Sequence, residues 1–158
     1  MTPLIIVVLI ILAVFGSVAM LKPSPRQQRL AKLRMDAIKL GLHVKLETFK
    51  TDSKKMGVRD DIVATRYERF IPEIKSHTLR WSVVRQAGWE QEGLPEGWSW
   101  NNINQRPDLN KLCELLAKVG DDVCVVEVYD NRASILTIES KTSVAEQINQ
   151  WVTEAQPL

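Results

Sequence analysis

The residues of this chain best suited to bind a metal are its two cysteines and two histidines. Cys113 and Cys124 are eleven positions apart, and His43 and His77 lie far upstream of both. Metal sites of this kind use short spacings such as CxxC or HxxxH, and neither pattern occurs. Cys113 falls on the apolar stripe of a predicted helix and Cys124 within an apolar run, where a thiol packs as a small hydrophobe. We therefore expect both cysteines in the core, with no metal and no cofactor.

Sequence motifs for nucleophilic catalysis and phosphate binding are not found either. There is no GxSxG, and no glycine-rich loop is followed by Lys and Ser or Thr. Two pairs of carboxylates, Asp60-Asp61 and Asp121-Asp122, could act as acid and base, but each pair directly precedes an apolar strand. Such a position favours turn residues. We predict no catalytic residue and expect a protein that is not an enzyme.

Three tryptophans are gathered in one segment that is rich in Gly and Pro. Trp89, Trp98 and Trp100 lie within residues 88–102, for which we predict a loop without regular structure. Two interpretations stay open. The rings could cover one face of a sheet as part of the core, or they could form a surface that binds another protein, as tryptophans do at binding hot spots. The three glutamates between them argue against insertion among anionic lipids.

The predicted element that fixes the location of the rest of the chain is a strongly apolar, uncharged run at residues 4–21, followed directly by Lys22. As a helix, its 18 residues would extend about 27 Å, close to the roughly 30 Å hydrocarbon thickness of a bilayer. The run therefore predicts a single transmembrane anchor at 1–22. Small residues at Ala13, Gly16 and Ser17 would allow another helix to pack closely against it.

A cleaved signal peptide is the alternative to an anchor. Ser17-Val18-Ala19 has the small-x-small form of a cleavage site. However, secretory signals begin with a basic segment, and no Lys or Arg precedes the apolar run. We therefore favour the uncut anchor. In an exported protein, by contrast, a disulfide between the two cysteines would become credible.

Basic residues follow the apolar run and predict its orientation. They are Lys22, Arg26, Arg29, Lys32 and Arg34. The positive-inside rule then places the N-terminus outside and the following domain in the cytoplasm. The same five residues could contact anionic lipid headgroups. Residues 81–158, in contrast, hold six basic and twelve acidic residues, so we expect no nucleic-acid partner.

Residue periodicity after the anchor predicts the remaining elements. Ser24 is a good N-cap with Pro25 at the first helical position, Gly41 ends that helix, and Asp108 caps a later one. Ser143 and Glu146 have the spacing of a capping box for the last helix. The predicted order is a basic amphipathic helix at 25–40, strands at 42–47, 62–70 and 77–86, a helix between 108 and 120, a hairpin of 123–129 with 133–138, and a helix after 143. The polar stretch at 51–61 is predicted to be a loop.

This order predicts an α+β fold. We expect a mostly antiparallel sheet of about five strands, with two helices on one face and with 123–129 and 133–138 as central strands covered on both sides. The predicted domains are the anchor at 1–22, a basic amphipathic juxtamembrane helix at 23–41 and a cytoplasmic α+β domain at 42–158.

The junction LKPSPRQQRLAKLR, at residues 21–34, together with one span and a small tryptophan-containing domain, resembles uncharacterised bitopic inner-membrane proteins of Gram-negative bacteria. The resemblance implies a bacterial inner membrane and brings no catalytic residues. We expect a membrane-tethered interaction or accessory module whose partners are the bilayer and another membrane or membrane-associated protein. The alternatives are a peripheral domain that senses anionic lipids and an enzyme that acts on a membrane-bound substrate.

Overall fold

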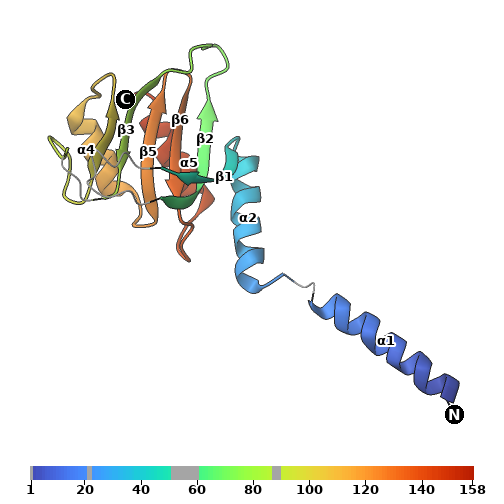
Figure 1. Cartoon of the computed structure of the whole chain (residues 1–158). Helices are drawn as coiled ribbons and strands as arrows, with labels where there is room; N and C mark the ends of the chain where they lie inside the picture. The colour runs from blue at the N-terminus through green and yellow to red at the C-terminus, as the bar shows by residue number, and fades with distance from the viewer. Residues whose placement is uncertain (1, 21–22, 51–60, 87–89) are drawn as a thin grey trace. The chain divides into compact units, whose positions relative to one another are not determined.

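The computed structural model of the protein describes residues 2–20, 23–50, 61–86 and 90–158 (Figure 1). The chain divides into two compact units, Met1–Lys32 and Leu33–Leu158. The division falls inside one helix, α2 (Pro25–Lys39), so the two halves of this helix belong to different units. The loop predicted at 51–61 lies, apart from its last residue, outside the described residues.

α1 (Thr2–Met20) occupies nearly all of the apolar run. Its described side chains are exposed, and the large apolar ones range from 46% exposed at Val8 to 71% at Leu4 and Phe15. Over the residues that the structure describes, no helix is both long and apolar enough to cross a membrane. Leu21 and Lys22, which end the predicted anchor, are not among those residues. The transmembrane anchor stays a prediction.

α2 begins and ends where the sequence predicts. The backbone amide of Ser24 donates to Oε1 of Gln27 at 2.9 Å, and the Gln27 amide donates to Oγ of Ser24 at 3.3 Å. Each side chain therefore satisfies an amide that the first helical turn leaves free. Gly41 has φ +85°, a conformation that favours glycine, and it ends the helix.

The second unit contains a six-stranded, wholly antiparallel sheet. The strand order is β1-β2-β6-β5-β3-β4, so β5 and β6 are central, as predicted. The strands are β1 (His43–Phe49), β2 (Ile62–Phe70), β3 (Leu79–Val84), β4 (Ser99–Ile103), β5 (Val123–Tyr129) and β6 (Arg132–Thr137). The α+β class is confirmed, but the expected number of strands was one too low.

β4 is the missed strand, and it lies inside the segment predicted to be an irregular loop. It pairs with β3 along the edge of the sheet, and the Trp100 amide donates to the carbonyl of Glu90 at 2.7 Å. The strand has only five residues, two of them asparagines, which seldom occur in strands. Its geometry is therefore imposed by pairing with β3 and by burial of Trp100, which no local pattern shows.

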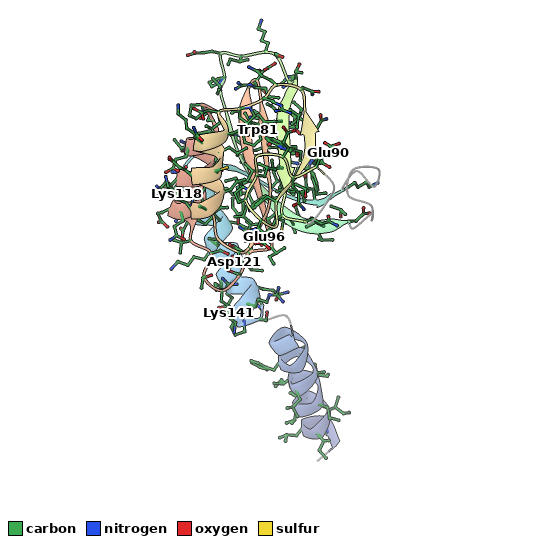
Figure 2. The ribbon with its side chains drawn as sticks, turned by 90° about the vertical axis from the view of Figure 1, so that its left-hand side faces the viewer. Trp81, Glu90, Glu96, Lys118, Asp121 and Lys141 are labelled. Atoms are coloured by element: carbon green, nitrogen blue, oxygen red, sulfur yellow. The ribbon has the colours of Figure 1, made fainter. Side chains whose placement is uncertain are left out.

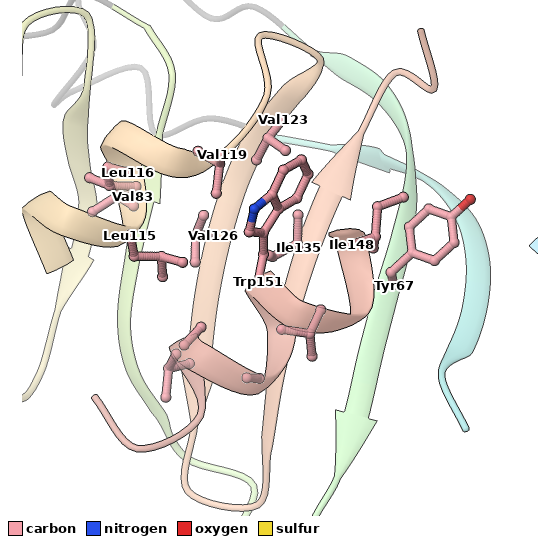
Figure 3. Packing of buried hydrophobic residues seen from close by; sticks show 14 of the residues in the cluster. Tyr67, Val83, Leu115, Leu116, Val119, Val123, Val126, Ile135, Ile148 and Trp151 are labelled. Atoms are coloured by element: carbon pink, nitrogen blue, oxygen red, sulfur yellow. The ribbon is translucent and has the colours of Figure 1, made fainter. Parts of the chain in front are cut away.

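Two helices of this unit, α4 (Leu109–Lys118) and α5 (Ala145–Ala155), pack on one face of the sheet (Figure 3). The side chains labelled in Figure 3 come from both helices and from β2, β3, β5 and β6, and they form one buried cluster. Leu33 and Ala37 of α2 join the same cluster. Trp81 also lies inside the domain, whereas Lys118 lies on its surface (Figure 2).

The two helices begin differently from each other. The Asp108 side chain accepts from the amides of Asn110 and Lys111 at 3.0 and 3.4 Å, so the predicted N-cap of α4 is confirmed. The capping box predicted for α5 is wrong: its N-cap is Val144, which has no side-chain cap hydrogen bond. The helix begins one residue later than the box requires, and the Ser143 hydroxyl donates to the buried carboxylate of Asp122.

The opposite face of the sheet has a smaller core of its own. Phe49, Ala64, Val84, Val125 and Leu136 form this second cluster. Val125 and Leu136 alternate along their strands with residues of the first cluster, so β5 and β6 are buried on both sides. The prediction of central, doubly covered strands is confirmed.

The core between α5 and the sheet should dominate the stability of the domain. Ile148 is fully buried, so Ile148→Ala should lower the free energy of unfolding by about 2–5 kcal/mol through lost burial and a cavity. Val144→Ala, at the exposed N-cap position of the same helix, is the matched control and should change the free energy of unfolding little. Denaturant unfolding followed by circular dichroism measures both. Equal effects would contradict the packing described for α5.

Candidate functional site

The cysteines and histidines of the domain are not brought together. Both thiols are free and half-buried: Cys113 donates to the Gly93 carbonyl at 3.2 Å, and Cys124 packs against the second cluster. Burial raises the pKa of the Cys124 thiol. His43 meets the ring of Phe70 edge to face. Among the described residues, no group of three His, Cys, Asp or Glu side chains could hold a metal ion.

Two of the predicted partner-surface tryptophans belong to the core. Trp98 and Trp100 are each 3% exposed. The Trp100 indole donates to the Glu92 carbonyl at 3.0 Å, and the Arg85 guanidinium lies 4.8 Å from the Trp98 ring centre. The interpretation as core therefore holds for both rings, and the interpretation as a binding surface is wrong for them. Trp89 lies outside the described residues.

The basic residues predicted to contact lipid have different environments. Arg26 and Lys32 are exposed, and Arg29 is half-buried. Arg34 instead forms an ion pair inside the second unit, and Lys22 lies outside the described residues. The predicted helix-packing residues Ala13, Gly16 and Ser17 all fall within α1. Among the residues predicted to contact lipid, Arg34 thus has its charge paired inside the protein.

Arg34 holds the C-terminal half of α2 against the sheet through Glu139. Its Nε lies 2.8 Å from Oε1 of Glu139, and its Nη2 lies 2.5 Å from Oε2. Nη2 also donates to the hydroxyl of Thr65 at 3.3 Å, and Tyr67 donates its hydroxyl to Glu139 Oε1 at 2.6 Å. We call these four residues the Arg34 clamp. A bidentate arginine–carboxylate pair with a further donor is among the strongest arrangements for holding two elements together.

Glu139 lies in an unusual environment within the clamp. It is 5% exposed and has φ +53°, which non-glycine residues seldom adopt. Burial alone would raise the pKa of the Glu139 carboxyl, but the hydrogen bonds from Arg34 and Tyr67 outweigh burial and hold that pKa below its usual range. Burial together with the same carboxylate raises the pKa of the Tyr67 hydroxyl. Glu139 is therefore charged at neutral pH and is a structural acceptor.

A second polar group supports the segment that carries Glu139. The backbone amide of Glu139 donates to Oγ1 of Thr137 at 3.0 Å, and the Thr137 hydroxyl donates to Asp122 at 2.8 Å. Asp122 is buried, whereas Asp121 is fully exposed and pairs with Arg85 at 3.0 Å. The interpretation of Asp121-Asp122 as turn residues rather than an acid–base pair is thus supported by these contacts.

Arg69 makes a further link between α2 and the domain. Its Nη2 donates to the Leu40 carbonyl at 2.9 Å and to Oδ1 of Asn149 at 2.6 Å. The carbonyl of Leu40 follows directly on the C-terminal end of α2, where helices leave acceptors free. The end of α2 is therefore held at two points, by the Arg34 clamp and by Arg69.

A buried charge cluster occupies the opposite face of the sheet. Arg66 donates through Nη1 to Glu127 at 2.6 Å and to Ser134 at 2.7 Å, and through Nε to Glu47 at 2.8 Å. The side chains of Arg66 and Glu127 are only 10% and 5% exposed. Burial would lower the pKa of Arg66, but the two carboxylates outweigh it and raise that pKa. With its charges paired inside the protein, the cluster is built to hold the sheet together.

A hollow of about 250 Å³ lies between α4 and the C-terminal end of α5. Leu115, Pro157 and Leu158 supply its apolar lining, and Lys118 and Glu154 form an ion pair at 3.4 Å on its wall. Lys111 and Glu114 add one positive and one negative charge to the lining, so the side chains of the lining carry no net charge.

Comparison with known proteins gives no relative for this chain. No protein-family model, curated protein or solved structure matches it significantly. Function must therefore be inferred from the contacts above. Sequence reasoning missed the Arg34 clamp and the Arg66 cluster, although one signal for the cluster was present: Glu127 is the single charged residue in the otherwise apolar run at 123–129.

Removing the charge of Arg66 should destabilise the domain strongly. Arg66→Met leaves the buried Glu127 without its cation and Glu47 with Lys45 alone, and should lower the free energy of unfolding by about 3–5 kcal/mol. Arg106→Met is the control, because Arg106 pairs with Glu92 at 3.4 Å at an exposed position. Denaturant unfolding should show almost no change for the control, and a mild effect of Arg66→Met would contradict the structural role of the cluster.

The Glu139 carboxyl should make stability depend on pH. Because its folded-state pKa lies below the ordinary value near 4.5, its stabilisation is complete above that value and is lost as the pH falls below it. Between about pH 6 and about pH 3, the wild type should thus lose more stability than Glu139→Gln, so the free energies of unfolding of the two proteins should converge as the pH falls. Unfolding midpoints measured across this range test the prediction, with the exposed Glu96→Gln as control. Parallel curves for wild type and Glu139→Gln would contradict the clamp.

Proposed function

We propose that this protein is a membrane-tethered, non-enzymatic interaction module at the cytoplasmic face of a bacterial inner membrane. The observation that carries the proposal is the exposure of α1: its large apolar side chains from Leu4 to Phe15 are between 46% and 71% exposed. The side chains drawn on α1 in Figure 2 are made of carbon alone. Such a surface is costly in water and favourable in hydrocarbon.

The proposed anchor is the whole apolar run at residues 4–21, of which α1 covers all but the last residue. The basic residues that follow the run support a cytoplasmic domain and an outside N-terminus. Ala13, Gly16 and Ser17 would be the contact points if another membrane helix packs against α1.

The proposed task of the domain is to meet a second protein at the membrane. Confinement to a surface raises the effective concentration of the domain toward a partner held in the same membrane, without any new contact. The short linkage supports this proposal, since only residues 21–24 separate α1 from α2. Lipid sensing is the second candidate function. It is favoured by the exposed Arg26 and Lys32 and would not involve Arg34, which is paired with Glu139.

Anchoring can be tested on the full chain expressed in a Gram-negative bacterium. The wild type should stay with the membrane pellet after alkaline carbonate extraction, because the apolar run is held in hydrocarbon. Val8→Arg combined with Leu12→Arg should release it, since each Arg at a helix centre costs about 2.5–3.5 kcal/mol of insertion free energy. Glu90→Gln with Glu96→Gln, on the domain, is the control for added charge, because it changes the net charge by the same amount. Release of the wild type would contradict the anchor.

The interaction role can be tested by isolating the anchored protein in mild detergent after crosslinking in whole cells. A partner present in fixed proportion is expected, and it should be retained in the control variant and lost in the variant that leaves the membrane. An isolated, uncrosslinked chain under all such conditions would contradict the interaction module.

A further inference from the structure

The second unit exposes four large apolar side chains beside the Arg34 clamp. Met35 and Ile38 of α2 are 55% and 52% exposed, and Leu46 of β1 and Val63 of β2 are 62% and 70% exposed. Folded domains rarely leave several large apolar residues exposed together, and a patch with a polar rim marks a place of interaction. We call these four residues the outer patch.

Helix spacing and strand register bring the four residues to one surface. Met35 and Ile38 are three positions apart on α2, and Ile38 lies one helical turn beyond Arg34. Leu46 is paired with Thr65, whose hydroxyl accepts from Arg34. Val63 lies two residues from Thr65 on β2, so its side chain is on the same face of the sheet. Leu46 and Val63 thus lie on the sheet face that Arg34 of α2 contacts through Thr65.

We infer that the outer patch rests in the headgroup layer of the membrane that holds the anchor, with its apolar side chains inserted among anionic lipids. Charge supports this occupant. α2 holds five basic residues and one acidic residue; Glu139 pairs with Arg34, and Asp36 pairs with Lys39 at 3.1 Å. Lys32 is exposed three positions before Met35, and the amine of Lys39, next to Ile38, is 69% exposed although it is paired. Apolar residues flanked by lysines are typical of surfaces that lie at a bilayer interface.

The covalent chain also supports a lipid occupant, and this step rests on the proposed function. If residues 4–21 span the bilayer, the step from residue 21 to residue 25 covers at most about 14 Å, because an extended chain advances no more than about 3.5 Å per residue. The start of α2 then lies no more than about 14 Å from the edge of the hydrocarbon. From there a helix advances only about 15 Å between residues 25 and 35.

The lipid contact inferred here differs from the one predicted from charge alone. Arg34 is held by Glu139, so it would orient the outer patch without touching lipid. The contact would instead be made by apolar side chains that no basic motif identifies. The Arg34 clamp thereby becomes a positioning element for a membrane-facing surface.

Site-directed spin labelling of the full chain in lipid nanodiscs tests this inference. In a Cys113→Ser, Cys124→Ser background, one label is placed by Met35→Cys or by Leu46→Cys, which leaves the other three residues of the patch intact. Asn110→Cys on α4 is the control, because α4 lies at the opposite end of the sheet from β1 (Figure 1). Power saturation with oxygen and with a water-soluble nickel complex then measures immersion.

In nanodiscs with anionic lipids, both patch labels should lie about 5–10 Å below the headgroup surface, whereas the control label stays in water. Replacement of the anionic lipids by zwitterionic ones at high salt should return the patch labels toward water. Patch labels as accessible to nickel as the control would overturn the inference. Spin–spin broadening at Leu46 would also overturn it, by showing that a second copy covers the edge strand β1. Failure of the chain to enter nanodiscs would count against the anchor instead.

Discussion

The bidentate pair between Arg34 and Glu139 is the interaction on which the arrangement of this protein depends. Only Leu33 and Ala37 of α2 are fully buried, and together they offer little apolar area for holding a helix. The charged pair, with Tyr67 as a further donor, supplies the missing attachment and fixes the rotation of α2 about its own axis. That rotation decides which residues of α2 face the core and which face outward.

On the other face of the sheet, the Arg66 cluster likewise adds charged contacts where the apolar core is small. That face has a small apolar core, in which Val125 and Leu136 are fully buried. Beside it, the sheet buries an arginine that would be costly to leave unpaired, and two carboxylates with a serine satisfy its donors. A cluster of this kind can close only in one strand register, because Glu47, Arg66 and Glu127 come from β1, β2 and β5. The Arg66 cluster therefore specifies the strand register and also stabilises the sheet.

The sequence predicts those parts of the fold that local chemistry determines. The start of α2 at Ser24, the start of α4 at Asp108 and the β5–β6 hairpin follow from caps, periodicity and a short polar turn. β4 could not be found in this way, because its five residues are held by β3 rather than by their own propensity. The α5 capping box was wrong because the helix begins one residue later, with Val144 as its N-cap, while Ser143 contacts Asp122, 21 residues upstream. The Arg34 clamp joins residues 105 positions apart, and no local pattern reports such a contact.

The contact between Arg34 and Glu139 also changes how the basic segment that follows the apolar run is interpreted. Read along the chain, Arg26, Arg29, Lys32 and Arg34 form one uniform charge run, and any of them could meet a headgroup. In the folded protein, Arg34 is neutralised by a carboxylate from the acidic C-terminal half, while Arg26 and Lys32 stay exposed. The excess of acidic residues after residue 81 is thus partly used inside the protein to hold a basic helix. The basic run therefore has two roles in the folded protein: Arg34 attaches α2 to the domain, and Arg26 and Lys32 keep their charges at the surface.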